Sequence, residues 1–428
     1  MFSTLRNAWK VADLRKKILF TFFIILIYRL GNVIPVPFVD TAALSATFEA
    51  QLGNTILGLY NVMSGSAFSQ ATIFALSIQP YINASIIIQL LTIAIPALER
   101  LSKEGGEEGK KKIERITRYT TVGLGLLMGF AYFMMLKNTF TGILTDNSFL
   151  SAVVIILSFT AGSTLVMWLG EQITEFGIGN GISIILFANI VSRLPSGVIN
   201  MGTQLVNDFS HYWYVVLVTI VAMLAMMVFI VFITQSERRI PVQYAKRVVG
   251  RKVYGGQNTN LPIKVNMTGV LPIIFAQSIC SLPATFATFF GMDQNNGWYK
   301  YVFSNTSVVY CVFYFLLIIG FSYFYATIQY NPVEIANNLK KNGGFIPGFR
   351  PGRPTSDFIA KVINKITLFG ALYLAVVAIA PIIAGAILGN TSVSIGGTSV
   401  IIVVGVALET VAAMEAQMLM RHYKGFLE

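Results

Sequence analysis

Residues 64–91 read SGSAFSQATIFALSIQPYINASIIIQLL and contain no Asp, Glu, Lys or Arg. From Ile73 onward the stretch is apolar for long enough to cross a membrane, which takes about 20 residues of helix. The part before it, from Ser64 to Thr72, is small, polar and contains a glycine, yet no charge separates it from the apolar run. The stretch therefore predicts a membrane-spanning helix that is preceded by a short, half-apolar segment.

The composition of the whole chain is that of a polytopic membrane protein. Of its 428 residues, 55% are hydrophobic and only 12% are charged, whereas soluble domains carry about 25% charged residues. The basic lead MFSTLRNAWKVADLRKK continues directly into the first apolar run, without a cleavable signal pattern. The two cysteines, Cys280 and Cys311, both fall in apolar runs, so we do not expect a disulfide framework.

Ten apolar runs are candidates for membrane-spanning helices, and the fifth is the shortest. They cover residues 18–34, 73–95, 116–136, 149–169, 180–194, 212–233, 267–290, 307–328, 366–388 and 398–418. Five spans on each side of a long break suggest two inverted halves, 1–195 and 196–428, an arrangement that is common in transport proteins. We therefore predict an all-α polytopic membrane protein with ten transmembrane helices in two pseudo-symmetric inverted five-helix halves.

Lysine and arginine are distributed unevenly over the loops between these runs. The chain has a formal net charge of +12, and 27 of its 31 Lys and Arg residues fall in the two termini and the 97–118, 234–265 and 329–365 loops. Because cytosolic loops are enriched in Lys and Arg, we predict that both termini lie in the cytosol. The 234–265 and 329–365 loops are also long. They predict a docking surface for a cytosolic partner, although charge that only fixes topology is the alternative interpretation.

Residues for hydrolytic or metal-dependent chemistry form no motif in the sequence. The two histidines, His211 and His422, fall at a span end and at the chain end, and no Cys/His cluster has metal-ligand spacing. Ser64 and Ser66 have no histidine in any span to act as their base. No phosphate-binding loop of the form GxxxxGKS or GxxxxGKT occurs. An intramembrane hydrolase is therefore disfavoured, and we expect no catalytic residue, metal or cofactor.

An ion-coupled secondary transporter is the other alternative. Such carriers place ionisable residues at mid-membrane, where they are costly and usually functional. Glu171 and Arg29 fall near span ends, and Glu409 and Glu415 fall late in the tenth span. Glu409 and Glu415 are expected near the cytosolic interface, so the sequence predicts no buried acidic pair and no proton-relay chain. This class is disfavoured but stays open.

Six stretches, in order and over essentially the whole chain, together resemble one family. They are IFALSIQPYINASIIIQLL, EQITEFGIGNGISI, PVQYAKR, LPIKVNMTGVLPIIFAQS, NPVEIANNLKKNGGFIPGFRPG and GGTSVIIV. In these stretches the chain is similar to the SecY family of bacterial protein translocase subunits, and most to its Gram-positive members. The resemblance implies a passive, non-enzymatic protein-conducting channel in the plasma membrane, with an hourglass pore between two halves.

The resemblance also assigns residues to the pore. Its waist would be an aliphatic ring of Ile78, Ile82, Ile182, Leu186, Ile274 and Ile402, with Leu186 where isoleucine is expected. Such side chains make a constriction that closes by dewetting. Residues from about 60 to 72 would form a plug, a short helix that seats under the ring. Its core is Tyr60, Asn61, Val62, Met63, Ser64, Gly65, Ser66, Ala67, Phe68 and Ser69. At about 25 cal/mol per Å² of apolar surface, its small residues predict a loosely held segment.

A lateral gate is implied between spans two and three of one half and spans seven and eight of the other. Polar residues on the gate helices are Asn83, Gln89, Asn266, Gln277, Ser278 and Ser281. Hydrogen bonds across the closed gate would each contribute about 0.6 kcal/mol. The alternative is that these side chains only brace their own helices. Pro272 and Pro283 within the seventh span would let it bend.

The same resemblance implies the partners. The SecA ATPase or the ribosome would dock on the basic loops through Arg238, Arg239, Lys246, Arg247 and Arg350. Lys and Arg pair with ribosomal phosphate in a salt-dependent way. The SecE and SecG subunits, signal peptides, preproteins and membrane lipids are the other expected partners.

Overall fold

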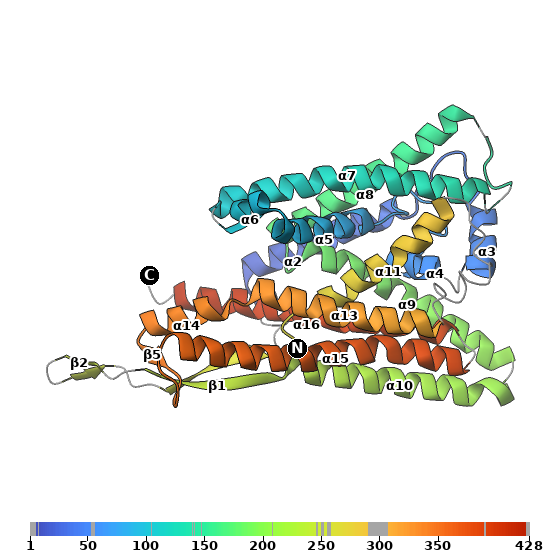
Figure 1. Cartoon of the computed structure of the whole chain (residues 1–428). Helices are drawn as coiled ribbons and strands as arrows, with labels where there is room; N and C mark the ends of the chain where they lie inside the picture. Colours follow the sequence, from blue (N-terminus) through green and yellow to red (C-terminus); the bar gives the residue numbers. More distant parts are fainter. Residues whose placement is uncertain are drawn as a thin grey trace.

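The computed structural model describes residues 6, 8–52, 56–103, 105–138, 140, 142–146, 148–207, 209–244, 247–249, 252–254, 258–289, 307–388 and 391–424. Long helices dominate, and most of them run along the horizontal of Figure 1. They are α2 (Ala12–Gly31), α5 (Gln79–Ala94), α7 (Gly106–Asn138), α8 (Phe149–Phe176), α9 (Gly181–Asn207), α10 (Phe209–Gln235), α11 (Leu271–Phe289), α13 (Val308–Gln329), α15 (Arg353–Leu388) and α16 (Thr391–Lys424). The shorter helices are α3 (Thr41–Leu52), α4 (Ile56–Met63), α6 (Pro96–Lys103) and α14 (Pro332–Lys341).

The helices define a multi-pass membrane protein. In the described part of the chain, seven helical segments are long and apolar enough to cross a membrane, or eight if the bent pair α5 and α6 forms one span. The two helices of this pair meet at 105°, where extended Ile95 precedes Pro96. Helix α2 is not among the seven, because its 20 residues include the charged side chains of Asp13, Arg15, Lys16, Lys17 and Arg29. Helix α11 qualifies only as a shorter apolar helix.

The helices form two groups that follow the order of the chain. In Figure 1 the N-terminal helices α2, α5, α7 and α8 lie above the C-terminal helices α10, α13, α15 and α16. Helices α9 and α11 run between the groups: α9 packs against α4, α8, α10 and α16, and α11 packs against α4, α5, α7, α13 and α15. The two groups therefore meet mainly through α9 and α11.

The second span begins later than the sequence predicts. Helix α5 starts at Gln79, and residues 64–78 form consecutive turns rather than the first turns of a helix. Three non-glycine residues in this region, Ser66, Ala71 and Ser77, have positive φ angles of 73°, 43° and 49°, a conformation that a helix does not contain. The turns lie directly against α8, because a Cβ on Gly162 would overlap the carbonyl oxygen of Ile73.

Two further predicted helix boundaries were wrong. The fifth span, expected at 180–194, belongs to a 27-residue helix, α9, that continues through Pro195 to Asn207. Pro272 is the second residue of α11, where a missing N–H costs nothing because the first turn has no intrahelical acceptor. Only Pro283 lies inside that helix and is placed to bend it.

The prediction of an all-α fold missed a small sheet. Strand β1 (Glu237–Tyr244) pairs in antiparallel fashion with β4 (Asn258–Lys264) from Glu237 opposite Lys264 to Gln243 opposite Asn258. It also pairs with β5 (Gly344–Phe345), and β2 (Arg247–Val249) pairs with β3 (Lys252–Tyr254). The buried face of the sheet packs on α14 and α15. Ile240, Val242, Ile263, Ile346 and Ile359 form this apolar cluster. The two long basic loops are therefore one folded unit.

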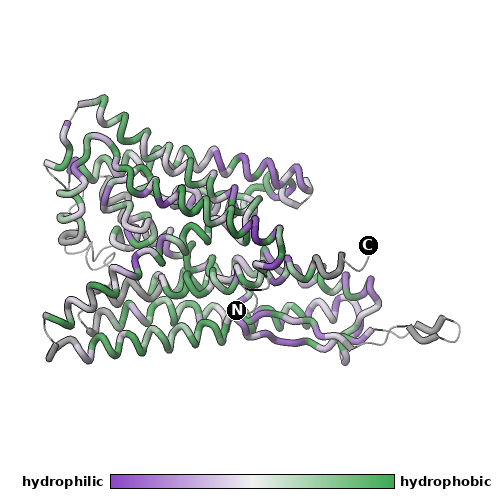
Figure 2. Tube along the Cα trace, turned by 180° about the vertical axis from the view of Figure 1, so that it is seen from behind, coloured by the Kyte–Doolittle hydropathy of each residue, from purple (hydrophilic) through white to green (hydrophobic). Residues whose placement is uncertain are grey.

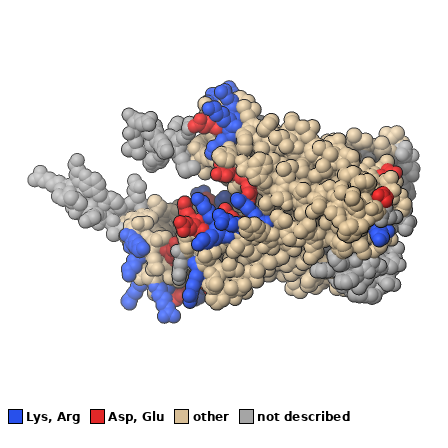
Figure 3. Space-filling view, turned by 90° about the horizontal axis from the view of Figure 1, so that it is seen from above, with Lys and Arg blue, Asp and Glu red and all other residues tan. Residues whose placement is uncertain are grey.

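Charge and hydropathy divide the molecule along its length. The tube coloured by hydropathy is mostly green along the long helices and purple toward the end that carries the strands (Figure 2). Lys and Arg gather at this same end, and the surface is notched between two charged lobes there (Figure 3). The first and last long helices also meet: Nζ of Lys17 on α2 donates to Oε1 of Gln417 on α16 at 3.4 Å.

Candidate functional site

The six residues of the predicted ring belong to one apolar cluster, although they come from four helices. Ile78 caps the start of α5 and Ile82 follows one turn later. Ile182 and Leu186 lie on α9, Ile274 lies on α11, and Ile402 lies on α16. All but Ile182 are buried, and Ile182 packs against the same cluster from a half-buried position. The cluster therefore joins both helix groups at the centre of the molecule.

Ile185 also faces this region, and the sequence analysis missed it. A Cβ on Gly170 of α8 would lie 3.4 Å from Cδ1 of Ile78, 3.5 Å from Cδ1 of Ile185 and 3.8 Å from Cγ1 of Ile182. The three side chains thus surround one glycine. Ile185 follows Ile182 by three residues, so it shares the same helix face, and this spacing was the available signal.

The Tyr60–Ser69 segment, predicted as the plug, begins inside α4 and continues into the turns that follow it. Its expected loose packing was wrong. The ring of Phe68 lies 4.6 Å from that of Tyr132 in an edge-to-face arrangement, and 5.6 Å from that of Phe48. Tyr132 also donates a hydrogen bond to the Phe68 carbonyl. Phe68 thus supplies the buried apolar area that the neighbouring serines and glycine lack.

Polar side chains within the segment form hydrogen bonds with the backbone groups of its turn. Oγ of Ser64 donates to the carbonyl of Asn61 at 3.1 Å and accepts from the N–H of Phe68 at 3.0 Å. Oδ1 of Asn61 accepts from the N–H of Ser69 at 3.0 Å. The serines and the asparagine therefore replace the backbone ladder that a helix would provide.

Met63, the last residue of α4, contacts both helix groups. Its sulfur accepts hydrogen bonds from Nε2 of Gln79 on α5 and from Nε2 of Gln277 on α11, each at 3.3 Å. One helical turn earlier, the Tyr60 hydroxyl lies 2.9 Å from Oγ of Ser281, also on α11. The segment is therefore hydrogen bonded to the C-terminal group as well as to its own.

Asn189 on α9 was not predicted as a site residue, yet it is fully buried at the end of α4. Its Nδ2 lies 2.8 Å from the carbonyl oxygen of Met63, 2.8 Å from the hydroxyl of Tyr28 and 3.3 Å from Oγ of Ser77. A lone amide in an apolar span was the only signal in the sequence.

Some of the predicted gate residues form hydrogen bonds across the gate, and others only brace their own helix or helix group. Gln89 bonds Ser85 on its own helix at 3.3 Å, and Ser281 donates to the carbonyl of Ser278 at 2.6 Å. Asn83 reaches Sδ of Met128 on α7 at 3.8 Å. The hydrogen bonds of Gln277 and Ser281 with α4, in contrast, cross between the helix groups. Asn266 is buried, and its Oδ1 has no hydrogen-bond partner among the described residues.

The basic residues predicted for docking lie on the sheet and the turn beside it. Arg238 and Arg239 are exposed on β1, and Nε of Arg239 pairs with Glu237 at 2.7 Å. Arg350 is exposed in the turn after β5, and its carbonyl accepts a hydrogen bond from Thr355 at the start of α15 at 2.8 Å. Lys246 lies outside the described residues. Arg247 begins β2, and its side chain is not described.

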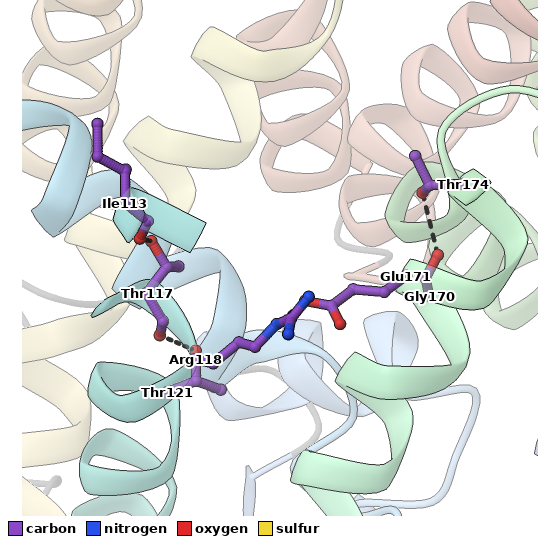
Figure 4. Close-up of polar contacts among 7 residues, drawn as sticks. All are labelled: Ile113, Thr117, Arg118, Thr121, Gly170, Glu171 and Thr174. Carbon is purple, nitrogen blue, oxygen red and sulfur yellow. Dashed lines mark hydrogen bonds and ion pairs between the residues drawn. The ribbon is translucent and has the colours of Figure 1, made fainter. Parts of the chain in front are cut away.

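An ion pair connects α7 and α8 at one edge of the bundle (Figure 4). Nε of Arg118 lies 2.8 Å from Oε1 of Glu171, and both side chains are partly exposed. Neighbouring threonines bond back to their own helices, as Thr121 does to the Thr117 carbonyl at 2.7 Å (Figure 4). The pair therefore braces α7 against α8.

No three His, Cys, Asp or Glu side chains come together as a metal site in the part of the chain that the structure describes. The chemistry that the site offers is thus apolar closure at the centre, amide and thioether hydrogen bonds around α4, and a basic platform at one end. Together these features define a helical membrane protein of the channel class.

Comparison with known proteins identifies the family. The SecY family model matches residues 72–411. A protein translocase subunit SecY from Streptomyces scabiei is 44% identical over 441 residues, covering 100% of both chains. The chain belongs to the SecY family, as the sequence motifs predicted, and is a non-enzymatic subunit of the protein translocation channel.

Solved structures share the fold. The chain resembles a structure titled as a protein conducting channel, with a TM-score of 0.69 and 17% identity over 94% of this chain and 92% of that one. It also resembles Sec61 in a canine ribosome-channel complex, with a TM-score of 0.65 and 16% identity over the same shares of the two chains.

Proposed function

We propose that the chain is the central, pore-forming subunit of the plasma-membrane Sec translocase. It conducts secretory polypeptides across the membrane and releases transmembrane segments into it. The observation that carries the proposal is that the six aliphatic residues, from the start of α5 and from α9, α11 and α16, belong to or pack against one apolar cluster that joins both helix groups. An apolar waist offers no hydrogen bonds to a particular sequence, and it excludes water when empty.

Ten helices span the membrane in this proposal, namely α2, α5, α7, α8, α9, α10, α11, α13, α15 and α16. Residues 1–195 and 196–428 are its two halves. Both termini lie in the cytosol with the strands and α14, in keeping with the gathering of Lys and Arg at that end (Figure 3). The hydrogen bond between Lys17 and Gln417 supports a common side for the first and last helices.

The Tyr60–Ser69 segment is the plug, and α5, α7 and α11 with α13 form the lateral gate. Burial of Phe68 and the contacts of Met63 with Gln79 and Gln277 support a seated plug that touches both sides of the gate. An apolar signal helix that separates α11 from α5 competes with hydrogen bonds worth about 0.6 kcal/mol each.

The folded sheet and the turn at Arg350 form the platform for SecA or for the ribosome. Exposed Arg238 and Arg350 on a unit packed against α15 support this role. SecE and SecG complete the assembly, and signal peptides, preproteins and lipids contact the gate. The chain itself carries no ATP-binding motif, so the partner supplies the energy.

Site-specific crosslinking of a stalled preprotein tests the proposal. A photoreactive residue in the stalled chain is expected to react with Ile78, Ile82, Ile274 or Ile402. Crosslinks confined to lipid-exposed residues of α10, such as Phe229, would contradict a central path. Saturable, ion-dependent uptake of a small solute by liposomes containing the chain alone would instead favour a secondary transporter.

Deletion of Tyr60–Ser69 tests the plug in planar bilayers. The resting ion conductance is expected to rise while the protein stays folded in detergent. An unchanged conductance in a folded deletion variant would contradict the assignment of the segment.

A further inference from the structure

Helix α4 ends against a side chain from another helix. The last carbonyls of an α-helix have no partner within the helix, and the Met63 carbonyl finds one in Nδ2 of Asn189 at 2.8 Å. The same nitrogen lies 2.8 Å from the Tyr28 hydroxyl on α2. Asn189 is therefore a side-chain cap for α4 that is itself tied to α2.

The backbone after α4 lies directly on the same part of α9. Gly65 has a φ of +68°, and a Cβ built on it would lie 3.1 Å from Oδ1 and 3.3 Å from Cα of Asn189. Any larger residue at position 65 would therefore press on Asn189 as well as adopt an unfavourable backbone conformation. The close approach and the hydrogen bond both seat the Tyr60–Ser69 segment at Asn189.

Asn189 also shares a helix face with the predicted pore ring. It follows Ile182 by seven residues, which is two turns of α9, and Leu186 by three. The hydrogen bonds of its side chain stay within the N-terminal group, to Met63, Tyr28 and Ser77. The bonds of the segment to Gln277 and Ser281, in contrast, cross to α11.

We propose that Asn189 is the positioning residue that keeps the Tyr60–Ser69 segment seated in the closed channel, by capping α4 from the helix that carries Ile182 and Leu186. The inference rests on the proposed channel function. Separation of α11 from the N-terminal group breaks the crossing bonds but leaves the Asn189 cap intact. Release of the segment is thus a second step, after gate opening. The Asn189 cap sets the equilibrium between the seated and the released segment.

Asn189→Asp tests this role with almost no change of shape. The carboxylate donates no hydrogen bond and faces the Met63 carbonyl, so the segment loses its cap. Resting ion conductance of the reconstituted channel is expected to rise about tenfold, the shift that follows when a buried acceptor loses its donor. Asn189→Ala, which adds no charge, is expected to raise it in the same direction if the aspartate variant does not fold.

Asn180→Asp, at the residue that directly precedes α9, is the control. Oδ1 of Asn180 accepts from the N–H groups of Ile182 at 3.0 Å and Ser183 at 3.4 Å, and a carboxylate accepts from both equally well. Its resting conductance is expected to equal that of the wild-type chain. An equal rise in both variants would show a general effect of charge on α9 and overturn the proposal.

A double variant separates positioning from general damage. Asn189→Asp added to the Tyr60–Ser69 deletion is expected to leave conductance at the level of the deletion, since the segment on which Asn189 acts is gone. A further rise would mean that α9 itself is disturbed. Wild-type conductance in both folded single variants, Asn189→Asp and Asn189→Ala, would also overturn the inference.

The test distinguishes this inference from the proposed function. The wild-type chain, reconstituted with its partners, must first translocate a signal-bearing preprotein. Failure there contradicts the channel role. Successful translocation, together with Asn189 variants whose resting conductance is unchanged, contradicts only the proposed role of Asn189 as a cap.

Discussion

The side-chain amide of Gln277 on α11 donates to the thioether of Met63 at the end of α4, with 3.3 Å between Nε2 and Sδ, although the two residues are 214 positions apart. Gln79 on α5 reaches the same sulfur at the same distance. A thioether is a weak acceptor, so the arrangement joins two helix groups through contacts that are easily broken. It also leaves Oε1 of both glutamines without a partner among the described residues.

Met63→Leu is expected to loosen the closed state. The substitution keeps the volume of the side chain, which cores tolerate well, but removes the acceptor for two amides. At about 0.6 kcal/mol for each hydrogen bond between membrane helices, resting conductance should rise severalfold. Met135→Leu is the control, because Met135 is also buried and its sulfur accepts no hydrogen bond among the described residues. Equal conductance in the two variants would contradict the role of the thioether.

Replacement of Ile78, Ile82, Ile274 and Ile402 by serine is expected to hydrate the waist. Hydroxyl groups hold water where aliphatic side chains exclude it, so ion and water permeability of proteoliposomes should increase. The matching set of valine substitutions keeps the surface apolar and should leave permeability low. Equal permeability of the serine and valine sets would argue against a dewetted constriction at these positions.

Arg350→Glu is expected to reduce post-translational export strongly while expression and membrane insertion of the chain stay normal. Arg350 is exposed in the turn between β5 and α15, and reversal of its charge repels an acidic or phosphate-bearing partner. Preprotein uptake by inverted vesicles measures the effect. Lys137→Glu, at the exposed end of α7, is the control. Full export by the Arg350 variant would contradict a motor contact there.

Gly162→Ala is expected to destabilise the fold, because a Cβ at this position overlaps the Ile73 carbonyl. Overpacking of a core typically costs about 1–3 kcal/mol. Thermal unfolding in detergent should show a lower midpoint. Gly123→Ala has open space around its new Cβ and should be neutral or stabilising by up to about 1 kcal/mol. A lower midpoint for the Gly123 variant than for the Gly162 variant would refute this packing argument.

Hydropathy alone located the long helices, because apolar runs and the basic loops between them can be read directly from the order of the residues. It failed at residues 73–78, which are as apolar as a helix but form buried turns. The turn before them, at residues 61–69, is closed by side-chain hydrogen bonds of Ser64 and Asn61. A buried turn and a buried helix have the same hydropathy, so only the contacts with α8 distinguish them.

The basic loops show a second limit of the sequence. Arg238 and Arg239 suggested a solvated surface, whereas Ile240, Val242 and Ile263 alternate into an apolar cluster on α15. Alternation over so few residues is a weak signal for a strand. Asn189 was missed for a different reason, since a single amide on a span gives no indication of the helix end that it caps.

The apolar cluster beneath the sheet connects the sheet to α15, one of the long apolar helices. Ile359 and Ile363 pack under the strands near the start of α15, which runs for 36 residues in all, a length of about 54 Å. If the sheet is the docking platform proposed above, a force on it would be transmitted along a helix rather than lost in a flexible loop. In the proposed channel, a partner bound at the sheet would therefore move the opposite end of the helix bundle by tilting α15.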